Sequence, residues 1–183
     1  MKKILKLTAI LFLISAIVAG VLGVVYELTI DRITEIAEQK TADAYAEVLS
    51  AKEYKEVQYT GADTAIDKIS EAYAEDGSLA GHVVETTVTG SQGSITIIIG
   101  VDPDNKCTGI SITSSSETSG LGAVASSPSD KGVAFREQFV GQGSDVALAK
   151  KGGSIEALTG ATITSNAVTG AVASATAACE SLG

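Results

Sequence analysis

The chain has 183 residues, of which 13 are lysine or arginine and 22 are aspartate or glutamate. Without Lys2, Lys3 and Lys6 the remainder holds 10 basic and 22 acidic residues, a net charge of −12. Nucleic acid is therefore not an expected partner, because nucleic-acid-binding domains are basic. The absence of tryptophan and an aromatic content of only 4% also exclude stacking platforms for bases.

The N-terminal segment is apolar and long enough to cross a membrane. Leu7 to Tyr26 holds no charged residue, and about 20 apolar residues span a hydrocarbon core as a helix. The lysines lie before this segment, so the positive-inside rule keeps the N-terminus in the cytoplasm. We expect a single-pass anchor in the lipid of the cell membrane, with the main domain extracytoplasmic. A cleaved signal peptide is the alternative, because Ala16–Gly20 holds small residues at a cleavable spacing.

Two helices are predicted after the anchor, which occupies residues 1–26. Glu27 to Leu49 carries apolar residues near a helical period without glycine or proline, which predicts a helical stalk over residues 27–50. The extracytoplasmic domain then covers residues 51–183. Thr64 to Tyr73 is predicted as a short amphipathic helix with its apolar residues on one face: Ile66, Ile69 and Tyr73.

Three strands follow, and they are joined by short turns. The strands are predicted at Gly81–Val88, Ser94–Val101 and Cys107–Thr113, with turn residues at 90–93 and 102–105. This order predicts an antiparallel meander in which alternate residues, Ile95, Ile97 and Ile99, share one face. Strands with flanking helices, rather than strict strand–helix alternation, indicate an α+β fold.

The C-terminal part mixes loops and helices. Ser114–Asp130 is polar, rich in glycine and without periodicity, and long loops of that kind are often functional. Lys131–Val140 is predicted as a short helix, Val146–Lys150 as a strand and Asn166–Leu182 as a helix.

Three residues invite a structural and a functional interpretation. His82 has no cysteine or histidine at ligand spacing, so a strand residue is favoured over a metal ligand. Cys107 and Cys179 are too few for a disulfide scaffold or a metal cluster. They would either pair outside the membrane or serve as small core residues.

Hydroxyl groups and a glycine gather just before the predicted last helix, in Thr159–Ser165. A helix start carries unpaired N–H groups and a partial positive charge, so it favours an anion. Gly160 lets the backbone approach a bulky ligand. A threonine here could cap the helix, donate a hydrogen bond to a phosphate, or be esterified by one.

The run Thr-Gly-Ala-Thr-Ile-Thr at 159–164 resembles the [S/T]-G-A-T-x-[S/T] flavinylation motif of the FMN-binding domain family. That family includes the G subunit of the Rnf electron-transport complex and the C subunit of the sodium-pumping NADH:quinone oxidoreductase. The resemblance implies a covalent phosphoester between FMN and the last hydroxyl residue, Thr164. Thr164 has no histidine or cysteine base beside it, so attachment is expected to need a separate flavin transferase.

A second motif lies in the polar loop. Glu117-Thr118 and Gly120-Leu121-Gly122 match the family signature H-x-E-T-P-G-L-G, while Ser115 replaces its histidine and Ser119 its proline. A flexible linker is the other interpretation of this segment. The two motifs together imply the cofactor-binding residues Thr159, Gly160, Ala161, Thr162, Thr164, Ser165, Glu117, Thr118, Gly120, Leu121 and Gly122.

The resemblance implies an electron-relay subunit of a membrane-bound Rnf-type ferredoxin:NAD oxidoreductase coupled to Na+ or H+ transport. Its partners would be the other membrane subunits. Neither iron–sulfur spacing nor a nucleotide-binding glycine fingerprint is present, so no complete active site is expected in this chain alone. The alternatives are the C subunit of the sodium-translocating quinone reductase, or a membrane-anchored structural or binding module without cofactor.

Overall fold

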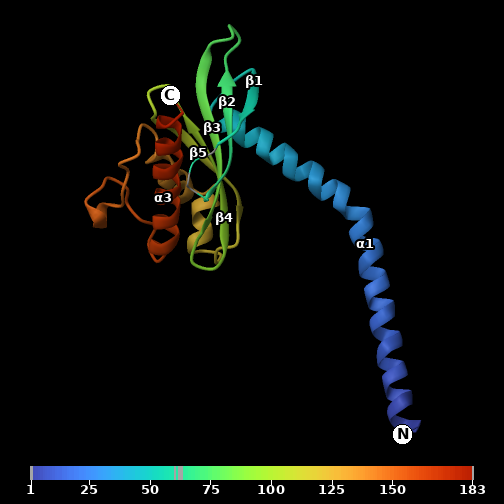
Figure 1. The fold of residues 1–183 in the computed structure, drawn as a ribbon. Helices are drawn as coiled ribbons and strands as arrows, with labels where there is room; N and C mark the ends of the chain where they lie inside the picture. The colour runs from blue at the N-terminus through green and yellow to red at the C-terminus, as the bar shows by residue number, and fades with distance from the viewer. Residues whose placement is uncertain (1, 60, 62–63, 183) are drawn as a thin grey trace. The chain divides into compact units, whose positions relative to one another are not determined.

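The structure is a computed structural model that describes residues 2–59, 61 and 64–182 (Figure 1). The chain divides into two compact units, residues 1–40 and 41–183. The first unit is a part of helix α1, Lys2–Val48, which runs without interruption through the predicted anchor and most of the stalk. By length and composition α1 can cross a membrane, and it is the one helix of that kind among the described residues.

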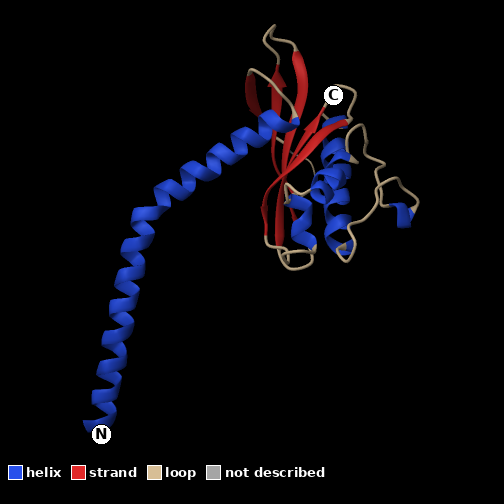
Figure 2. Cartoon of the chain, turned by 180° about the vertical axis from the view of Figure 1, so that it is seen from behind, coloured by secondary structure: helices blue, strands red, loops and turns tan. Residues whose placement is uncertain are grey.

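The second unit is built on a five-stranded antiparallel sheet whose strands are neighbours in chain order (Figure 2). The last three strands confirm the predicted meander, and two further strands precede it. The strands are β1 Glu53–Val57, β2 Ile66–Tyr73, β3 Leu79–Thr89, β4 Ser94–Val101 and β5 Cys107–Ser115.

The predicted helix at Thr64–Tyr73 is wrong, because this segment forms β2. Ile69 lies between Val57 of β1 and Val84 of β3 in the sheet register. The spacing of its apolar residues fits a helical period, but it also fits a strand when β1 and β3 pair with its two edges. Pairing with distant segments therefore decides the outcome, as is common for strands.

One face of the sheet carries the main core. Ile95, Ile97 and Ile99 are buried there, which confirms their predicted common face. Helix α3, Thr162–Glu180, lies along this face in both views (Figures 1 and 2). The shorter α2, Asp130–Glu137, confirms a helix close to the predicted bounds and adds Phe135 to the same core.

The opposite face is covered by the end of α1. Tyr45 and Val48 pack against Val83 and Ile98 in a second, smaller core. The Val48 carbonyl also accepts a hydrogen bond of 2.5 Å from the Thr108 hydroxyl. The final turns of α1 therefore belong to the sheet domain.

Several other expectations are refined. The predicted strand at 146–150 is wrong: Leu148 forms one isolated bridge with Ile155, and a 3-10 helix, η2 Ala149–Lys151, follows. The polar loop contains a 3-10 helix, η1 Gly122–Ser126. Helix α3 begins at Thr162, four residues before the predicted start, because the hydroxyl-bearing residues form its first turn.

The residues with two interpretations take structural positions. His82 lies in β3 with its Nδ1 atom buried and without a hydrogen-bond partner, and burial lowers the pKa of its imidazole. Cys107 and Cys179 are both buried and unpaired. Burial raises the pKa of each thiol to about 12, so both remain protonated core residues.

Replacing Ile97 by alanine should destabilise the sheet domain strongly. The side chain is fully buried at the centre of β4, so the substitution removes apolar contacts and leaves a cavity. We expect the free energy of unfolding to fall by about 2–5 kcal/mol, measured by denaturant titration of the full chain in detergent. Leu79→Ala, at an exposed position, is the control and should cost much less; equal losses would contradict the assigned core.

Candidate functional site

The centre of the site is the carboxylate of Glu117, which joins three separate segments. Its Oε1 atom accepts hydrogen bonds from the backbone N–H groups of Ser91, at 2.7 Å, and Gln92, at 3.0 Å. Its Oε2 atom accepts one from the Thr164 hydroxyl at 2.6 Å. The carboxylate thus ties the turn between β3 and β4 to the first turn of α3, with the glycine-rich loop held between them.

Two glycines make room for this carboxylate. A Cβ atom at Gly122 would lie 2.2 Å from Glu117 Oε2 and 2.6 Å from Thr164 Oγ1. A Cβ atom at Gly90 would lie 2.3 Å from Glu117 Oε1. A side chain at either position would therefore displace the carboxylate from its present place.

The same contacts determine the protonation of Glu117. Partial burial alone would raise the pKa of this carboxyl group. The hydrogen bonds from Thr164 and from the backbone of Gln92, Ser91 and Gly93 outweigh that effect and lower the pKa below its ordinary value. Glu117 is therefore a carboxylate at neutral pH, and its charge faces the positive end of α3.

The hydroxyl groups of the first motif take different positions. Thr164 is only 1% exposed, because its hydroxyl is directed inward to Glu117. Ser165 is fully buried and accepts a hydrogen bond from the Leu158 N–H while donating one to the Ala161 carbonyl. Thr159 and Thr162 are exposed.

None of these hydroxyls caps α3. The N-cap residue is Ala161, and it makes no side-chain cap hydrogen bond. The capping interpretation of the threonines is therefore wrong. Gly160 precedes the helix with a φ of 77°, a left-handed conformation that a residue with a side chain adopts at a cost.

The two motifs meet around a cavity of about 290 Å³. From the loop it is lined by Glu117, Thr118, Leu121 and Gly122, and from the helix start by residues 160–164. The loop is therefore ordered against the helix start, which contradicts a flexible linker. Thr118 supports it through its carbonyl, which accepts hydrogen bonds from the N–H groups of Leu121 and Ala123.

The positions that depart from the family signature have modest roles. Ser115, in place of the histidine, accepts a hydrogen bond of 3.3 Å from the Glu117 N–H. Ser119, in place of the proline, is exposed. Gly120 follows with a φ of 78°, and nothing lies within 4 Å of where its Cβ would be.

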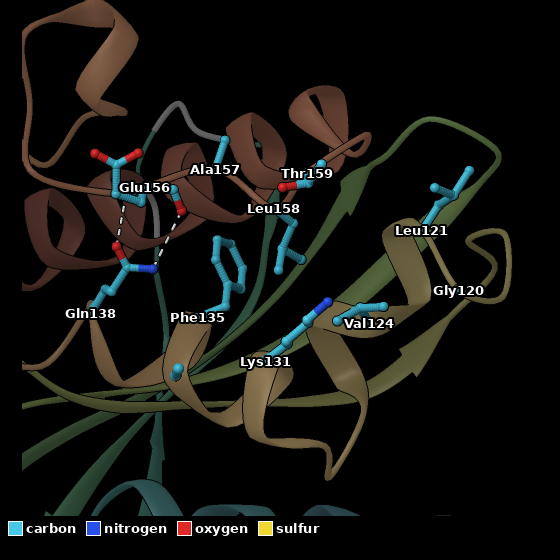
Figure 3. A pocket seen from close by; sticks show the side chains of 11 residues that line it. Gly120, Leu121, Val124, Lys131, Phe135, Gln138, Glu156, Ala157, Leu158 and Thr159 are labelled. Atoms are coloured by element: carbon cyan, nitrogen blue, oxygen red, sulfur yellow. Dashed lines mark hydrogen bonds between the residues drawn. The ribbon is translucent and has the colours of Figure 1, made fainter.

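A larger cavity of about 570 Å³ opens beside the loop (Figure 3). Its walls come from the loop, from α2 and from the segment before the first motif, and its lining is Gly120, Leu121, Val124, Lys131, Ala134, Phe135, Gln138, Glu156, Ala157, Leu158 and Thr159. A volume of this size is in the range of cofactor sites, about 300–1,000 Å³. Most of these residues were missed from the sequence, because α2 is distant in the chain and carries no motif.

The segment at Glu156 forms the cavity wall opposite α2, and the side-chain amide of Gln138 holds this segment in place. The side chain of Gln138 donates a hydrogen bond to the Glu156 carbonyl at 3.3 Å and accepts one from the Glu156 N–H at 2.7 Å. Figure 3 shows this pair at one end of the cavity and Leu121 at the other. The larger cavity shares Leu158 and Thr159 with a third cavity of about 290 Å³, which also holds Thr162.

The sheet, the glycine-rich loop and the hydroxyl-bearing helix start define an FMN-binding domain, and the family model described as FMN-binding domain matches residues 90–177. A second model, described as RnfG N-terminal region, matches residues 1–48. The chain belongs to the family of G subunits of Rnf-type ion-translocating oxidoreductase complexes.

Two relatives carry this assignment. The G subunit of an ion-translocating oxidoreductase complex from Methanosarcina acetivorans is 32% identical over 95% of this chain and 93% of its own length. The G subunit of a Na(+)-translocating ferredoxin:NAD(+) oxidoreductase complex from Acetobacterium woodii is 35% identical over 93% and 89%.

A solved structure shares the fold. It is the C subunit of the Na(+)-translocating NADH-quinone reductase from Parabacteroides distasonis, with a TM-score of 0.53 and 23% identity. The match covers 76% of this chain and 80% of that chain.

Glu117→Gln should destabilise the domain in a pH-dependent manner. An amide offers one acceptor oxygen where the carboxylate accepts three hydrogen bonds, so we expect a loss of about 1–3 kcal/mol at pH 7. Because the folded pKa of Glu117 is lowered, its stabilisation is complete above the ordinary value of 4.5 and is lost as the pH falls through the folded value.

The difference between wild type and Glu117→Gln should therefore shrink on acidification, measured by denaturant titration at several pH values. Glu75→Gln, at an exposed carboxylate, is the control and should show no such difference. A difference that is constant with pH would show that the Glu117 charge is not involved.

Proposed function

We propose that this chain is the flavin-carrying electron-relay subunit of a membrane-bound Rnf-type ferredoxin:NAD oxidoreductase coupled to Na+ or H+ transport. The observation that carries the proposal is the similarity to G subunits over more than nine-tenths of the chain. The Acetobacterium woodii relative is named as Na(+)-translocating, and a Clostridium ljungdahlii relative, 44% identical over 48% of this chain, as proton-translocating.

The membrane arrangement is part of the proposal. Residues 1–26 anchor the chain in lipid with the N-terminus in the cytoplasm, residues 27–50 form the stalk, and residues 51–183 are extracytoplasmic. Support comes from the lysines before the apolar segment and from the length of α1. The other membrane subunits of the complex are the electron donor and acceptor.

FMN is the proposed cofactor, joined covalently through its phosphate to Thr164, the last hydroxyl residue of the motif. Thr164 lines the cavity of about 290 Å³ between the two motifs, and its hydroxyl donates a hydrogen bond to Glu117. Thr162 is the alternative acceptor, because it is exposed, is the first residue of α3 and lines two of the three cavities described above.

The helix start suits a phosphate at this position. The N–H groups of the first turn of a helix have no partner within the helix, and they combine with the helix dipole to stabilise an anion. Thr164 would lose its proton and form a bond from Oγ1 to the phosphorus of an activated flavin nucleotide supplied by a flavin transferase, while the bond between that phosphorus and the nucleotide's leaving group breaks. Bound FMN supplies the redox chemistry, and the chain positions it.

Thr164→Val should abolish covalent flavin, whereas Thr162→Val should retain it. The first variant removes the proposed acceptor oxygen with almost no change in shape, together with one hydrogen bond to Glu117, and the second removes an exposed hydroxyl. Each variant would be coexpressed with a flavin transferase and assayed by flavin fluorescence in denaturing gels and by intact mass, for a gain of FMN less one water.

Thr159→Val tests the other exposed hydroxyl and should also retain the flavin. These variants are needed because no lysine or arginine follows Lys151, so trypsin leaves all three threonines in one peptide. Loss of label only in Thr162→Val would overturn the assignment to Thr164. A wild-type chain without any added mass would end the flavoprotein proposal.

A further inference from the structure

The contact between Glu117 and Thr164 joins the two motifs at a single pair of oxygen atoms. The Thr164 hydroxyl donates a hydrogen bond of 2.6 Å to Glu117 Oε2. Among the described residues it is the one hydrogen bond between a motif hydroxyl and a titratable side chain, because Ser165 bonds to backbone groups on both sides. A general base has to lie within about 2.6–3.2 Å of the atom whose proton it removes. Glu117 meets this condition for the oxygen that is proposed to bind phosphorus.

The carboxylate is fixed in a position and a charge state that suit a base. Oε1 accepts hydrogen bonds from the N–H groups of Ser91 and Gln92, so the group cannot rotate away from Thr164 without losing both of them. Partial burial would raise the pKa of Glu117, but the hydrogen bonds outweigh that effect and lower it. The carboxylate is therefore ionised at neutral pH and free to accept a proton.

The same pair of residues faces a cavity. Thr164 is only 1% exposed, yet it and Glu117 both line the cavity of about 290 Å³ between the motifs. The lining also includes Leu121, which is 47% exposed, and Ile163, which is 62% exposed. A flavin phosphate that enters this cavity consequently meets the acceptor oxygen and the carboxylate on one wall.

A proton transfer to Glu117 also keeps the charge of the site constant. Before attachment the carboxylate carries one negative charge beside the positive end of α3. A phosphodiester on Thr164 carries one negative charge as well, and two like charges at this distance would disfavour each other. If Glu117 takes the Thr164 proton, the carboxyl group becomes neutral as the phosphodiester forms. The helix start then faces one negative charge throughout.

We propose that Glu117 is the general base for attachment of the flavin phosphate to Thr164. The proposal rests on the function proposed above. The Oγ1–H bond of Thr164 breaks and its proton passes to Glu117 Oε2, while Oγ1 forms a bond to phosphorus. The bond from phosphorus to the leaving group breaks, and with flavin adenine dinucleotide as the activated donor that group is AMP. The transferase binds the donor, and the acceptor chain supplies the base; nothing is oxidised or reduced.

The test measures the rate of attachment with purified components. The full chain is expressed without a transferase and purified in detergent. It is then mixed with purified flavin transferase and excess flavin adenine dinucleotide, and the gain of FMN less one water is followed by intact mass and by flavin fluorescence in denaturing gels. Glu117→Gln, which keeps the shape and removes the base, should slow attachment by about 100-fold or more. Glu117→Asp keeps a carboxylate and should be faster than Glu117→Gln.

Two controls separate chemistry from stability and charge. Ile97→Ala is expected to lose at least as much stability as Glu117→Gln, and Ile97 lines none of the three cavities. Glu75→Gln removes an exposed carboxylate and the same unit of charge. Both variants should be labelled at close to the wild-type rate. Denaturant titration establishes that each variant is folded under the assay conditions.

A small carboxylate should replace the missing side chain. Glu117→Ala leaves space at the wall of the cavity, and sodium formate supplies a base of the same chemistry. The rate of attachment in Glu117→Ala should rise with formate concentration, whereas sodium chloride at the same ionic strength should leave it unchanged. A side chain that only holds the loop in place would give no such difference between the two salts.

The outcomes separate this inference from the proposed function. A wild-type chain that gains no mass would remove the proposed function itself. Attached flavin with an unchanged rate in Glu117→Gln would overturn the role of Glu117 alone. Equal slowing in Ile97→Ala and Glu117→Gln, or a folded Glu117→Ala that formate does not rescue, would also overturn it. Retention of label in Thr164→Val would overturn it as well, but would leave the chain a flavoprotein.

Discussion

The hydrogen bonds of one carboxylate hold the site together. Glu117 connects the turn after β3, the glycine-rich loop and the first turn of α3, which are far apart in the sequence. The geometry depends on the absence of side chains at Gly90 and Gly122, where a Cβ would occupy the space of the carboxylate oxygens. The loop is consequently held in place without secondary structure of its own at that point, and Glu117 lines the cavity between the two motifs.

This arrangement places the hydroxyl groups of the motif in two different environments. Residues two apart on a helix point to nearly opposite sides, so Thr162 and Thr164 lie on different faces of α3. Thr164 is buried as the donor to Glu117, and Ser165 joins the preceding turn to the helix. Thr162 is exposed.

The sequence predicted those parts of the fold that depend on local patterns. The alternation of Ile95, Ile97 and Ile99 and the turn residues around them were sufficient for the last three strands. β2 was missed because its apolar spacing also fits a helix, and only pairing with β1 and β3 distinguishes the two. The start of α3 was placed too late because threonine and serine have weak helix propensity, which packing overrides. Which threonine faces inward is a property of that packing and is absent from the motif.

The acceptor position also has a consequence for biosynthesis. Helix α3 is the last element made, and its residues Val168, Ala171 and Val172 fill the core on the main face of the sheet. A polypeptide truncated before α3 would lack the core residues that this helix contributes and also the proposed acceptor threonine in its first turn. Under the proposed function, a polypeptide that ends before α3 cannot receive the flavin, so covalently bound cofactor marks chains whose synthesis has passed the start of this helix.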